Sequence, residues 1–252
     1  MTDIAATELP VYGMPDSGTH KYINRERSGL PESYTLLIKR FVEDEAKENG
    51  GIFVDVAGGT GELSRKIEDE TGIKSISVDY SPMGMKDVRL PGVVGDAQRL
   101  PIPSHVAGVV HIKDALEHLD DKQFQSFVDE VERVLVKGGN LIITELDYHL
   151  STPYTRVRTK NGHMEDVVMH SGENYPEFLN RLHKEYGVEV KPRFVYYPRS
   201  GRRIIMELSS RGFKCNETLS WVPKNNEPEW FGDPMFRNVL VFSREDDDLS
   251  LG

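Results

Sequence analysis

The chain has 252 residues, of which 38% are hydrophobic and 29% charged, and a formal net charge of −10. This length can bury one good core, so a single elaborated domain is expected over 1–252. The negative charge opposes general attraction to nucleic-acid phosphates, and the single cysteine excludes an internal disulfide.

Location and metal content follow from what the sequence lacks. No run approaches the roughly 18 apolar residues that span a bilayer, and the first residues lack a basic segment followed by an apolar core. Cys215 stands alone, without a Cys/His cluster at zinc-ligand spacing. We therefore expect a cytoplasmic protein with no membrane partner and no metal, and the oligomeric state stays open.

The first part of the chain predicts an arm, a helix and then a sheet. Residues 1–30 are rich in Pro, Gly, Ser and Thr without a clear period, which indicates an N-terminal arm or lid. Tyr34, Leu37, Ile38 and Phe41 follow at helical spacing, before a glycine stop at Gly50 and Gly51. A helix therefore precedes the first strand of a core over 31–145.

Short apolar runs alternate with helical patterns through that core. Such alternation predicts right-handed βαβ units and a parallel sheet with helices on both faces. The strands are expected in "IFVDV", "SISVD", "GVVGD", "AGVVHI" and "NLIITE", and the helices near 60–70, 82–88 and 121–137, the last of them ended by Gly138 and Gly139.

The C-terminal half changes rhythm. An insertion over 146–200 contains one amphipathic helix, "NYPEFLNRLHKEYG". In the segment 201–252, the helix "RRIIMELSSRG" precedes the strands "KCNETLSWV" and "NVLVFSR", which no helix separates. Such strands usually form an antiparallel pair.

The stretch "VDVAGGTGELS" places a glycine turn between a strand and a helix. That arrangement brings backbone N–H groups and the positive end of a helix to the carboxyl edge of the sheet, where open α/β folds bind ligands. A P-loop is excluded because its Lys and Ser/Thr pair is missing. A dinucleotide fingerprint fits imperfectly, because Ser64 stands where Gly or Ala packs best. A structural tight turn remains the alternative.

Three consecutive strands each end in an aspartate. Asp79 can accept hydrogen bonds from both hydroxyls of a ribose, and Asp96, in "GDAQRLPIP", suits an adenine amino group beside an apolar wall. Asp55 can serve an amino-acid ammonium or the adjoining turn. An ammonium is present in S-adenosylmethionine and absent from NAD.

From Gly51 to Asp147 the chain resembles the class I S-adenosylmethionine-dependent methyltransferases. It is similar to the small-molecule branch that includes ubiquinone-biosynthesis methyltransferases. The motifs that carry the resemblance are "VDVAGGTGE", "SVDYS", "GDAQRLPIP", "HIKDALEHLDD" and "VERVLVKGGNLIITE". Ala57 departs from the family by standing in its first glycine place. The resemblance implies a Rossmann-like, seven-stranded, mostly parallel sheet with an antiparallel final strand.

The resemblance also implies S-adenosylmethionine as cofactor and a set of residues that hold it. Asp55, Ala57, Gly59 and Gly61 would line the methionine moiety, and Asp79 with Tyr80 the ribose. Asp96 and Ala97 would line the adenine, and Lys113 with Asp114 the edge that faces the sulfonium. A solvated pair at a helix start is the alternative for Lys113 and Asp114.

The fourth strand is followed by "KDAL" rather than an N-P-P-(Y/F/W) tetrapeptide, which argues against methylation of DNA bases or glutamine. We therefore expect O- or N-methylation of a small molecule or short peptide. Residues 190–211 contain six Lys or Arg against Glu207, a local charge of +5, which favours an anionic acceptor. The alternative is that these arginines pair with surface carboxylates. The expected substrate-binding residues are Tyr22, Arg25, Tyr148, Arg193, Tyr196, Tyr197 and Arg199, and the candidate catalytic residues are His149 and Asp114.

Three other functions remain. A tRNA or rRNA methyltransferase rests only on the basic stretch 190–211. An NAD-dependent oxidoreductase is disfavoured by Ser64 and by the lack of a Tyr-x-x-x-Lys pair after the fourth strand. The last alternative is a non-catalytic S-adenosylmethionine-binding module.

Overall fold

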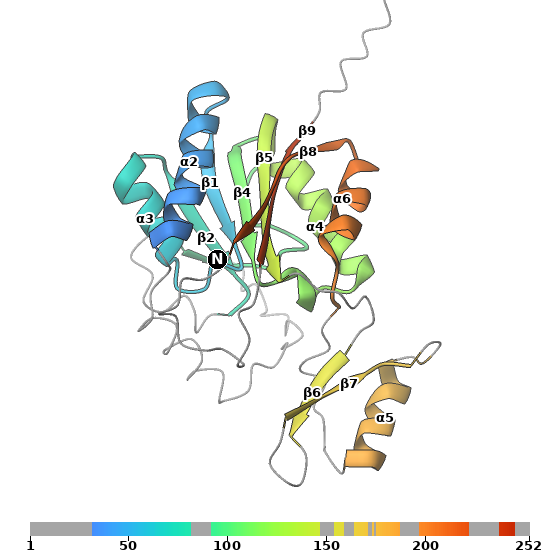
Figure 1. Cartoon of the computed structure of the whole chain (residues 1–252). Coiled ribbons are helices and arrows are strands. Elements are labelled where there is room, and N and C mark those ends of the chain that lie inside the picture. The colour runs from blue at the N-terminus through green and yellow to red at the C-terminus, as the bar shows by residue number, and fades with distance from the viewer. Residues whose placement is uncertain are drawn as a thin grey trace, which may run out of the picture.

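The computed structural model describes residues 32–81, 92–146, 154–158, 164–170, 173, 175–186, 197–221 and 237–244. A seven-stranded sheet in the order β3-β2-β1-β4-β5-β9-β8 forms its centre (Figure 1). β9 runs antiparallel to both of its neighbours, and the other pairings among β1 to β5 are parallel, which confirms the expected fold class. The strands are β1 (Ile52–Val56), β2 (Ser75–Asp79), β3 (Gly92–Val94), β4 (Ala107–Lys113), β5 (Leu135–Leu146), β8 (Phe213–Trp221) and β9 (Arg237–Arg244).

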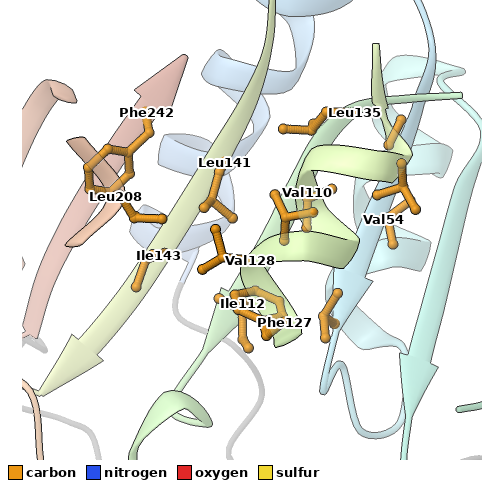
Figure 2. Packing of buried hydrophobic residues seen from close by; sticks show 14 of the residues in the cluster. Val54, Val110, Ile112, Phe127, Val128, Leu135, Leu141, Ile143, Leu208 and Phe242 are labelled. Atoms are coloured by element: carbon orange, nitrogen blue, oxygen red, sulfur yellow. The ribbon is translucent and has the colours of Figure 1, made fainter. Parts of the chain in front are cut away.

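Helices cover both faces of the sheet (Figure 1). α2 (Glu32–Glu48) and α3 (Glu62–Thr71) pack on one face, while α4 (Asp121–Val134) and α6 (Gly201–Ser209) pack on the other. Phe127 and Val128 of α4 lie against Val110 and Ile143 of the central strands (Figure 2). Successive strand residues point to opposite faces, so each strand contributes to both cores and reads as a continuous apolar run.

α4 begins as its sequence predicts but ends earlier. Asp120 accepts a hydrogen bond from the backbone of Gln123, whose side chain accepts one from the Asp120 N–H, so the two form a capping box. The helix ends at Val134 rather than at Gly138 and Gly139, and β5 begins at Leu135. Gly139 lies in that strand, where an added Cβ would meet the Gly108 carbonyl oxygen at 2.9 Å. Gly139 therefore allows β4 and β5 to approach closely, and neither glycine ends the helix.

The insertion holds more structure than expected. A hairpin of β6 (Tyr154–Arg158) and β7 (Met164–Val168) accompanies the predicted helix, α5 (Tyr175–Tyr186), beyond the carboxyl ends of the central strands (Figure 1). Val167 packs against Phe178 and Leu182 in a small core of its own. The "KNG" between the two strands, with its Asn-Gly pair, is the sequence signal that could have predicted this hairpin.

The helix expected at 82–88 and the arm over 1–30 lie outside the described residues. Among the helices that are described, none combines the length and the apolar composition needed to cross a bilayer.

Candidate functional site

Three strand-end aspartates meet at one edge of the sheet. β1 and β2 pair in parallel with Asp55 opposite Ser77, and β2 and β3 pair with Asp79 opposite Val94. Asp96 follows β3 by two residues. Because parallel strands end at the same edge, the carboxylates of Asp55, Asp79 and Asp96 gather where α/β sheets bind ligands.

The glycine turn between β1 and α3 uses left-handed backbone. Ala57 has φ 58°, Gly59 φ 57° and Gly61 φ 73°. Left-handed backbone is ordinary for glycine and costs about 1–2 kcal/mol for a residue with a Cβ. Gly58 is required for a different reason, since a Cβ there would overlap Ser77 Oγ and lie 2.6 Å from Asp55 Oδ2. The departure at Ala57 therefore leaves the turn intact at the expense of local strain.

The N–H groups of this turn are already hydrogen-bonded within the protein. Gly58 N donates to Val78 O at 3.3 Å, and Gly61 N donates to Gly58 O at 3.0 Å. Gly59 N donates to Asp79 Oδ2 at 2.8 Å. A pyrophosphate needs such N–H groups for itself, and a carboxylate bonded to the turn repels an anion. The turn therefore suits a neutral or cationic group better than a dinucleotide.

Two backbone N–H groups fix the orientation of the Asp79 carboxylate. Its Oδ2 accepts from Gly59 N, its Oδ1 accepts from Ser81 N at 2.7 Å, and the residue is 5% exposed. Each carboxylate oxygen carries a second lone pair, so both can also accept a hydroxyl. The backbone hydrogen bonds fix the orientation of the carboxylate, as binding of a ribose diol requires. Tyr80 beside it is partly exposed.

Asp96 begins a short turn next to an apolar wall. Its Oδ1 accepts from Gln98 N at 2.9 Å, and Asp96 itself is partly exposed. Ala97 packs against the main core, in which Leu100 and Ile102 are buried. A hydrogen-bonding edge beside an apolar surface is the combination that an adenine ring requires.

The comparisons with known proteins agree with this geometry. The family model "Methyltransferase domain" matches residues 54–143. Ubiquinone/menaquinone biosynthesis C-methyltransferases UbiE are 27% identical over 158 residues in Enterobacter sp. strain 638 and 30% identical over 134 residues in Escherichia coli O1:K1 / APEC. The matches cover 55% and 48% of this chain and 62% and 53% of those relatives, so the chain matches little more than half of their length.

Solved structures share the fold. The DhpI–SAH complex has a TM-score of 0.51 at 16% identity and covers 92% of this chain and 96% of its own. A protein of Pyrococcus horikoshii OT3 has a TM-score of 0.54 at 16% identity, with 94% and 97% covered. Residues 54–143 therefore match a methyltransferase domain, and the fold is that of the class I S-adenosylmethionine-dependent methyltransferases. The strand-end carboxylates and the turn without a phosphate cradle fit that cofactor.

Asp55 of the methyltransferase domain belongs to a buried hydrogen-bonded chain. Its Oδ1 lies 2.7 Å from His111 Nδ1, and His111 Nε2 lies 2.7 Å from the Tyr34 hydroxyl. That hydroxyl lies 2.8 Å from Thr144 Oγ1. The chain links β1, β4, β5 and α2, and none of its members is more than 3% exposed. His111 therefore bonds to one oxygen of Asp55, and the other oxygen lies so close to the turn that a Cβ added at Gly58 would be 2.6 Å from it.

Sequence reasoning gave His111 and Tyr34 no functional role. The signal for His111 was a polar ring in the middle of the apolar run "AGVVHI", at the register position of Asp55 on the adjacent strand. Tyr34 was expected only as an apolar member of the first helix, and it is fully buried there. Its hydroxyl partners come from 77 and 110 residues away, beyond the reach of local patterns.

Lys113 and Asp114 form an ion pair at the end of β4. Lys113 Nζ donates to Asp114 Oδ2 at 2.6 Å, and the side chains are 23% and 8% exposed. Lys113 Nζ also lies 5.8 Å from the centre of the Tyr34 ring. Asp114 has φ 48°, a left-handed conformation that costs free energy for aspartate. The pair is thus mostly buried and not the solvated pair that was the alternative.

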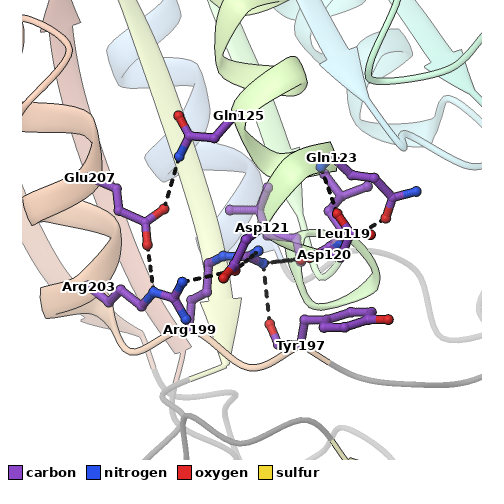
Figure 3. Close-up of polar contacts among 10 residues, drawn as sticks. Leu119, Asp120, Asp121, Gln123, Gln125, Tyr197, Arg199, Arg203 and Glu207 are labelled. Atoms are coloured by element: carbon purple, nitrogen blue, oxygen red, sulfur yellow. Dashed lines mark hydrogen bonds and ion pairs between the residues drawn. The ribbon is translucent and has the colours of Figure 1, made fainter. Parts of the chain in front are cut away.

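Arg199 connects the end of the insertion to the turn after β4 and to the start of α4 (Figure 3). Its Nη1 donates to the carbonyls of Leu116 and Leu119 at 3.0 and 2.8 Å, and its Nη2 donates to Asp121 Oδ1 at 3.0 Å. Burial lowers the pKa of its guanidinium, against the raising effect of Asp121. The expectation that Arg199 binds an acceptor gains no support, because Arg199 is 3% exposed and its Nη1 and Nη2 groups bond to the turn after β4 and to Asp121, while its Nε has no hydrogen-bond partner among the described residues.

The neighbouring arginines show the same pattern. Arg203 pairs with Asp121 at 2.9 Å and Glu207 at 2.5 Å, and Arg211 pairs with Asp129 at 2.5 Å and Glu132 at 2.8 Å. This is the alternative in which the basic stretch neutralises surface carboxylates.

The remaining expected site residues divide into two groups. Tyr197 is partly buried and packs against the small core of the insertion, while its N–H donates to Glu117 O at 2.6 Å. The other group lies outside the described residues and consists of Tyr22, Arg25, Tyr148, His149, Arg193 and Tyr196. Of the candidate catalytic residues, the structure therefore describes Asp114 alone.

Proposed function

We propose that this protein transfers the methyl group of S-adenosylmethionine to an oxygen or nitrogen atom of a small molecule or short peptide. The observation that carries the proposal is Asp79, a buried carboxylate held by backbone N–H groups at the end of β2 with lone pairs for a diol. The match of the methyltransferase family over residues 54–143, which include Asp79, supports it.

The residues described perform binding and orientation. S-adenosylmethionine supplies a methyl group already activated by its sulfonium. Asp79 would hold the ribose, and the edge formed by Asp96 and Ala97 would receive the adenine. The turn at Gly59 and Gly61, together with Asp55, would receive the methionine end. Placing the methyl group in line with the acceptor can supply most of the acceleration.

The need for a base depends on the acceptor. A hydroxyl or a protonated amine requires proton removal, whereas a neutral amine does not. The family resemblance assigns Asp114 to the edge that faces the sulfonium, and the Asp114 carboxylate accepts a hydrogen bond from Lys113 Nζ. His149 stays a proposed base, and the arm 1–30 and insertion 146–200 stay the proposed acceptor-binding segments.

A carbon acceptor is the second candidate. The relatives at 27% and 30% identity are named C-methyltransferases. Carbon methylation at an activated position needs the same cofactor geometry, so only the acceptor distinguishes it from the first candidate.

The proposal leaves the charge of the acceptor open and places the protein in the cytoplasm. We no longer assign the acceptor a negative charge, because Arg199, Arg203 and Arg211 bind protein carboxylates or carbonyls. The same pairing weakens the tRNA or rRNA alternative, which rests on those charges. A cytoplasmic location is proposed from the single cysteine.

Calorimetric titration tests the cofactor. We expect saturable binding of S-adenosylmethionine and S-adenosylhomocysteine, and none of NAD. Saturable NAD binding without sulfonium binding would overturn the proposal. Transfer of labelled methyl groups from S-adenosylmethionine to fractionated small molecules, followed by mass spectrometry of the product, then identifies the methylated atom. A product methylated on carbon selects the second candidate, and cofactor binding with no transfer to any fraction favours a binding module.

A further inference from the structure

The turn that follows β4 is fastened by a carboxyl group from β5. Glu145 Oε1 accepts hydrogen bonds from Ala115 N at 3.2 Å and Leu116 N at 2.9 Å. These two N–H groups open the short helix Leu116–His118, and Glu145 is 4% exposed. Glu145 thus connects the end of β5 to the segment directly after Lys113 and Asp114.

The same short helix presents a second buried carboxyl to the first. Glu117 is 6% exposed, and its buried Oε2 has no hydrogen-bond partner within the described residues. Glu117 directly follows Leu116, whose N–H bonds to Glu145, so both buried carboxyls belong to the same short turn, and Glu117 raises the pKa of Glu145. Two carboxylates cannot bond to each other, because ionised carboxylates only accept hydrogen bonds.

A single proton resolves this arrangement. A protonated carboxyl both donates and accepts, so one proton satisfies the orphan oxygen of Glu117 and removes one buried charge. Oε1 of Glu145 already accepts two backbone N–H groups, which leaves Oε2 as the better place for the proton. We propose that Glu145 is a neutral carboxylic acid that donates to Glu117, and that it is a positioning residue for the acceptor side of the methyltransferase site.

The surrounding charges agree with a proton on Glu145. Burial raises the pKa of Glu145 well above its usual range, and the neighbouring carboxyls of Glu117 and Asp114 raise it further. Asp114 is paired with Lys113, and His118 Nε2 lies 4.0 Å from Glu117 Oε1. Arg199, the other cation at this turn, binds its carbonyls instead.

The proton has a consequence for the proposed methyl transfer, on which this part of the inference rests. The turn is held by Glu145 on one side and by Arg199 and Tyr197 on the other. Loss of the proton places two negative charges together in a buried site, and the turn must move to separate them. The stabilisation from a group whose pKa is raised by folding is fully present below its unfolded pKa, 4.5 for this glutamate, and is lost progressively as the pH rises through the folded pKa. Alkaline pH should therefore loosen the acceptor side.

Two variants separate the proton from the carboxyl. Glu145→Gln keeps an acceptor for the backbone N–H groups and a donor for Glu117 but has no proton to lose. Glu145→Ala removes both. Glu48→Gln, at an exposed position of α2, is the matched control. Carboxyl ¹³C NMR of glutamate-labelled protein from pH 4 to 9 follows the ionisation, and hydrogen exchange of Ala115 and Leu116 amides follows the turn.

One glutamate should stay protonated through neutral pH, and its signal should be absent only from Glu145→Gln and Glu145→Ala. In Glu145→Gln, the Ala115 and Leu116 amides should keep their protection against hydrogen exchange at all pH values, whereas in Glu145→Ala this protection should fall about tenfold or more. In the wild-type protein, the protection of the same two amides should fall at alkaline pH. Titration of Glu145 near its ordinary value, or equal loss in Gln and Ala variants, overturns the proposal. S-adenosylmethionine calorimetry on the same proteins tests the proposed function separately, because the carboxyl and amide results do not depend on that ligand.

Discussion

The two halves of the sheet's carboxyl edge treat their buried acids in opposite ways. At β1 and β2, Asp55 and Asp79 accept hydrogen bonds from three donors, namely the His111 imidazole and the backbone N–H groups of Gly59 and Ser81. At β4 and β5, Glu145 meets backbone N–H groups but also a second acid, Glu117. The first half is completed by the motifs themselves, whereas the second is completed by Arg199 and Tyr197 from the end of the insertion. The direct partners of the acids in the cofactor half therefore belong to the sequence motifs, although His111 lies 56 residues from Asp55, whereas the acceptor half also depends on Arg199, whose partners lie 80 and 83 residues away.

His111→Leu should break the cofactor half most severely. It leaves Asp55 and the Tyr34 hydroxyl buried without the imidazole, and removing one partner of a buried pair costs about 3–5 kcal/mol of unfolding free energy. Chemical denaturation measures the loss. Tyr34→Phe removes only the hydroxyl and should cost about 1–2 kcal/mol. A His111→Leu variant that loses less than Tyr34→Phe would mean that the chain is not the support of the turn.

Asp79→Ala should reduce cofactor affinity next most strongly. Hydrogen bonds to a charged group contribute about 1.5–3 kcal/mol, so calorimetry should show S-adenosylmethionine binding weakened by about 10- to 150-fold. Circular dichroism must first show the variant folded, because Asp79 also holds Gly59 and Ser81. Asp96→Ala, at a partly exposed site, is the comparison and should have a smaller effect. Unchanged affinity in Asp79→Ala would remove the ribose assignment.

The insertion should be sensitive to acid through Glu173. This carboxylate accepts from Arg181 Nε and Nη2 at 2.9 and 3.0 Å and from His170 N, and the hydrogen bonds from Arg181 lower its pKa to about 2. Because folding lowers this pKa, the stabilisation is present above pH 4.5 and is lost as the pH falls toward 2. We expect Glu173→Gln to reduce local stability by about 1–2 kcal/mol at pH 7.

Hydrogen exchange in β7 and α5 measures this effect. Wild-type protection should fall toward that of the variant as the pH is lowered, while protection in β1 and β4 should differ little between the two proteins. A uniform loss over both regions would show that the insertion does not open independently of the sheet.

Ala57→Gly should have the smallest effect and the opposite sign. The left-handed conformation costs alanine about 1–2 kcal/mol, and the greater freedom of glycine in the unfolded chain offsets part of this, so a net gain of about 0.5–1 kcal/mol is expected. Thermal unfolding should show a slightly higher Tm. Asp114→Gly relieves a similar φ but also removes the pair with Lys113, so it should not show the same gain.

Local sequence patterns predicted the succession of the strands and helices of the sheet, the glycine turn, the three strand-end aspartates and the cofactor. These features are local, since strand periodicity, turn chemistry and strand ends are written within a few residues. It predicted wrongly that Gly138 and Gly139 end α4, because a glycine needed for close strand packing looks the same as one that stops a helix. It also missed the β6–β7 hairpin despite its Asn-Gly pair.

The partners of the buried polar groups became known from the folded structure alone. Arg199 looked available for an acceptor until packing placed it against carbonyls 80 and 83 residues away. The partners of His111, Tyr34 and Glu145 also come from separate elements. A sequence shows which charges exist, but burial determines which must be paired, because an unpaired polar group loses its hydration on folding. The cofactor could thus be predicted from adjacent residues, whereas the acceptor side depends on contacts that folding alone creates.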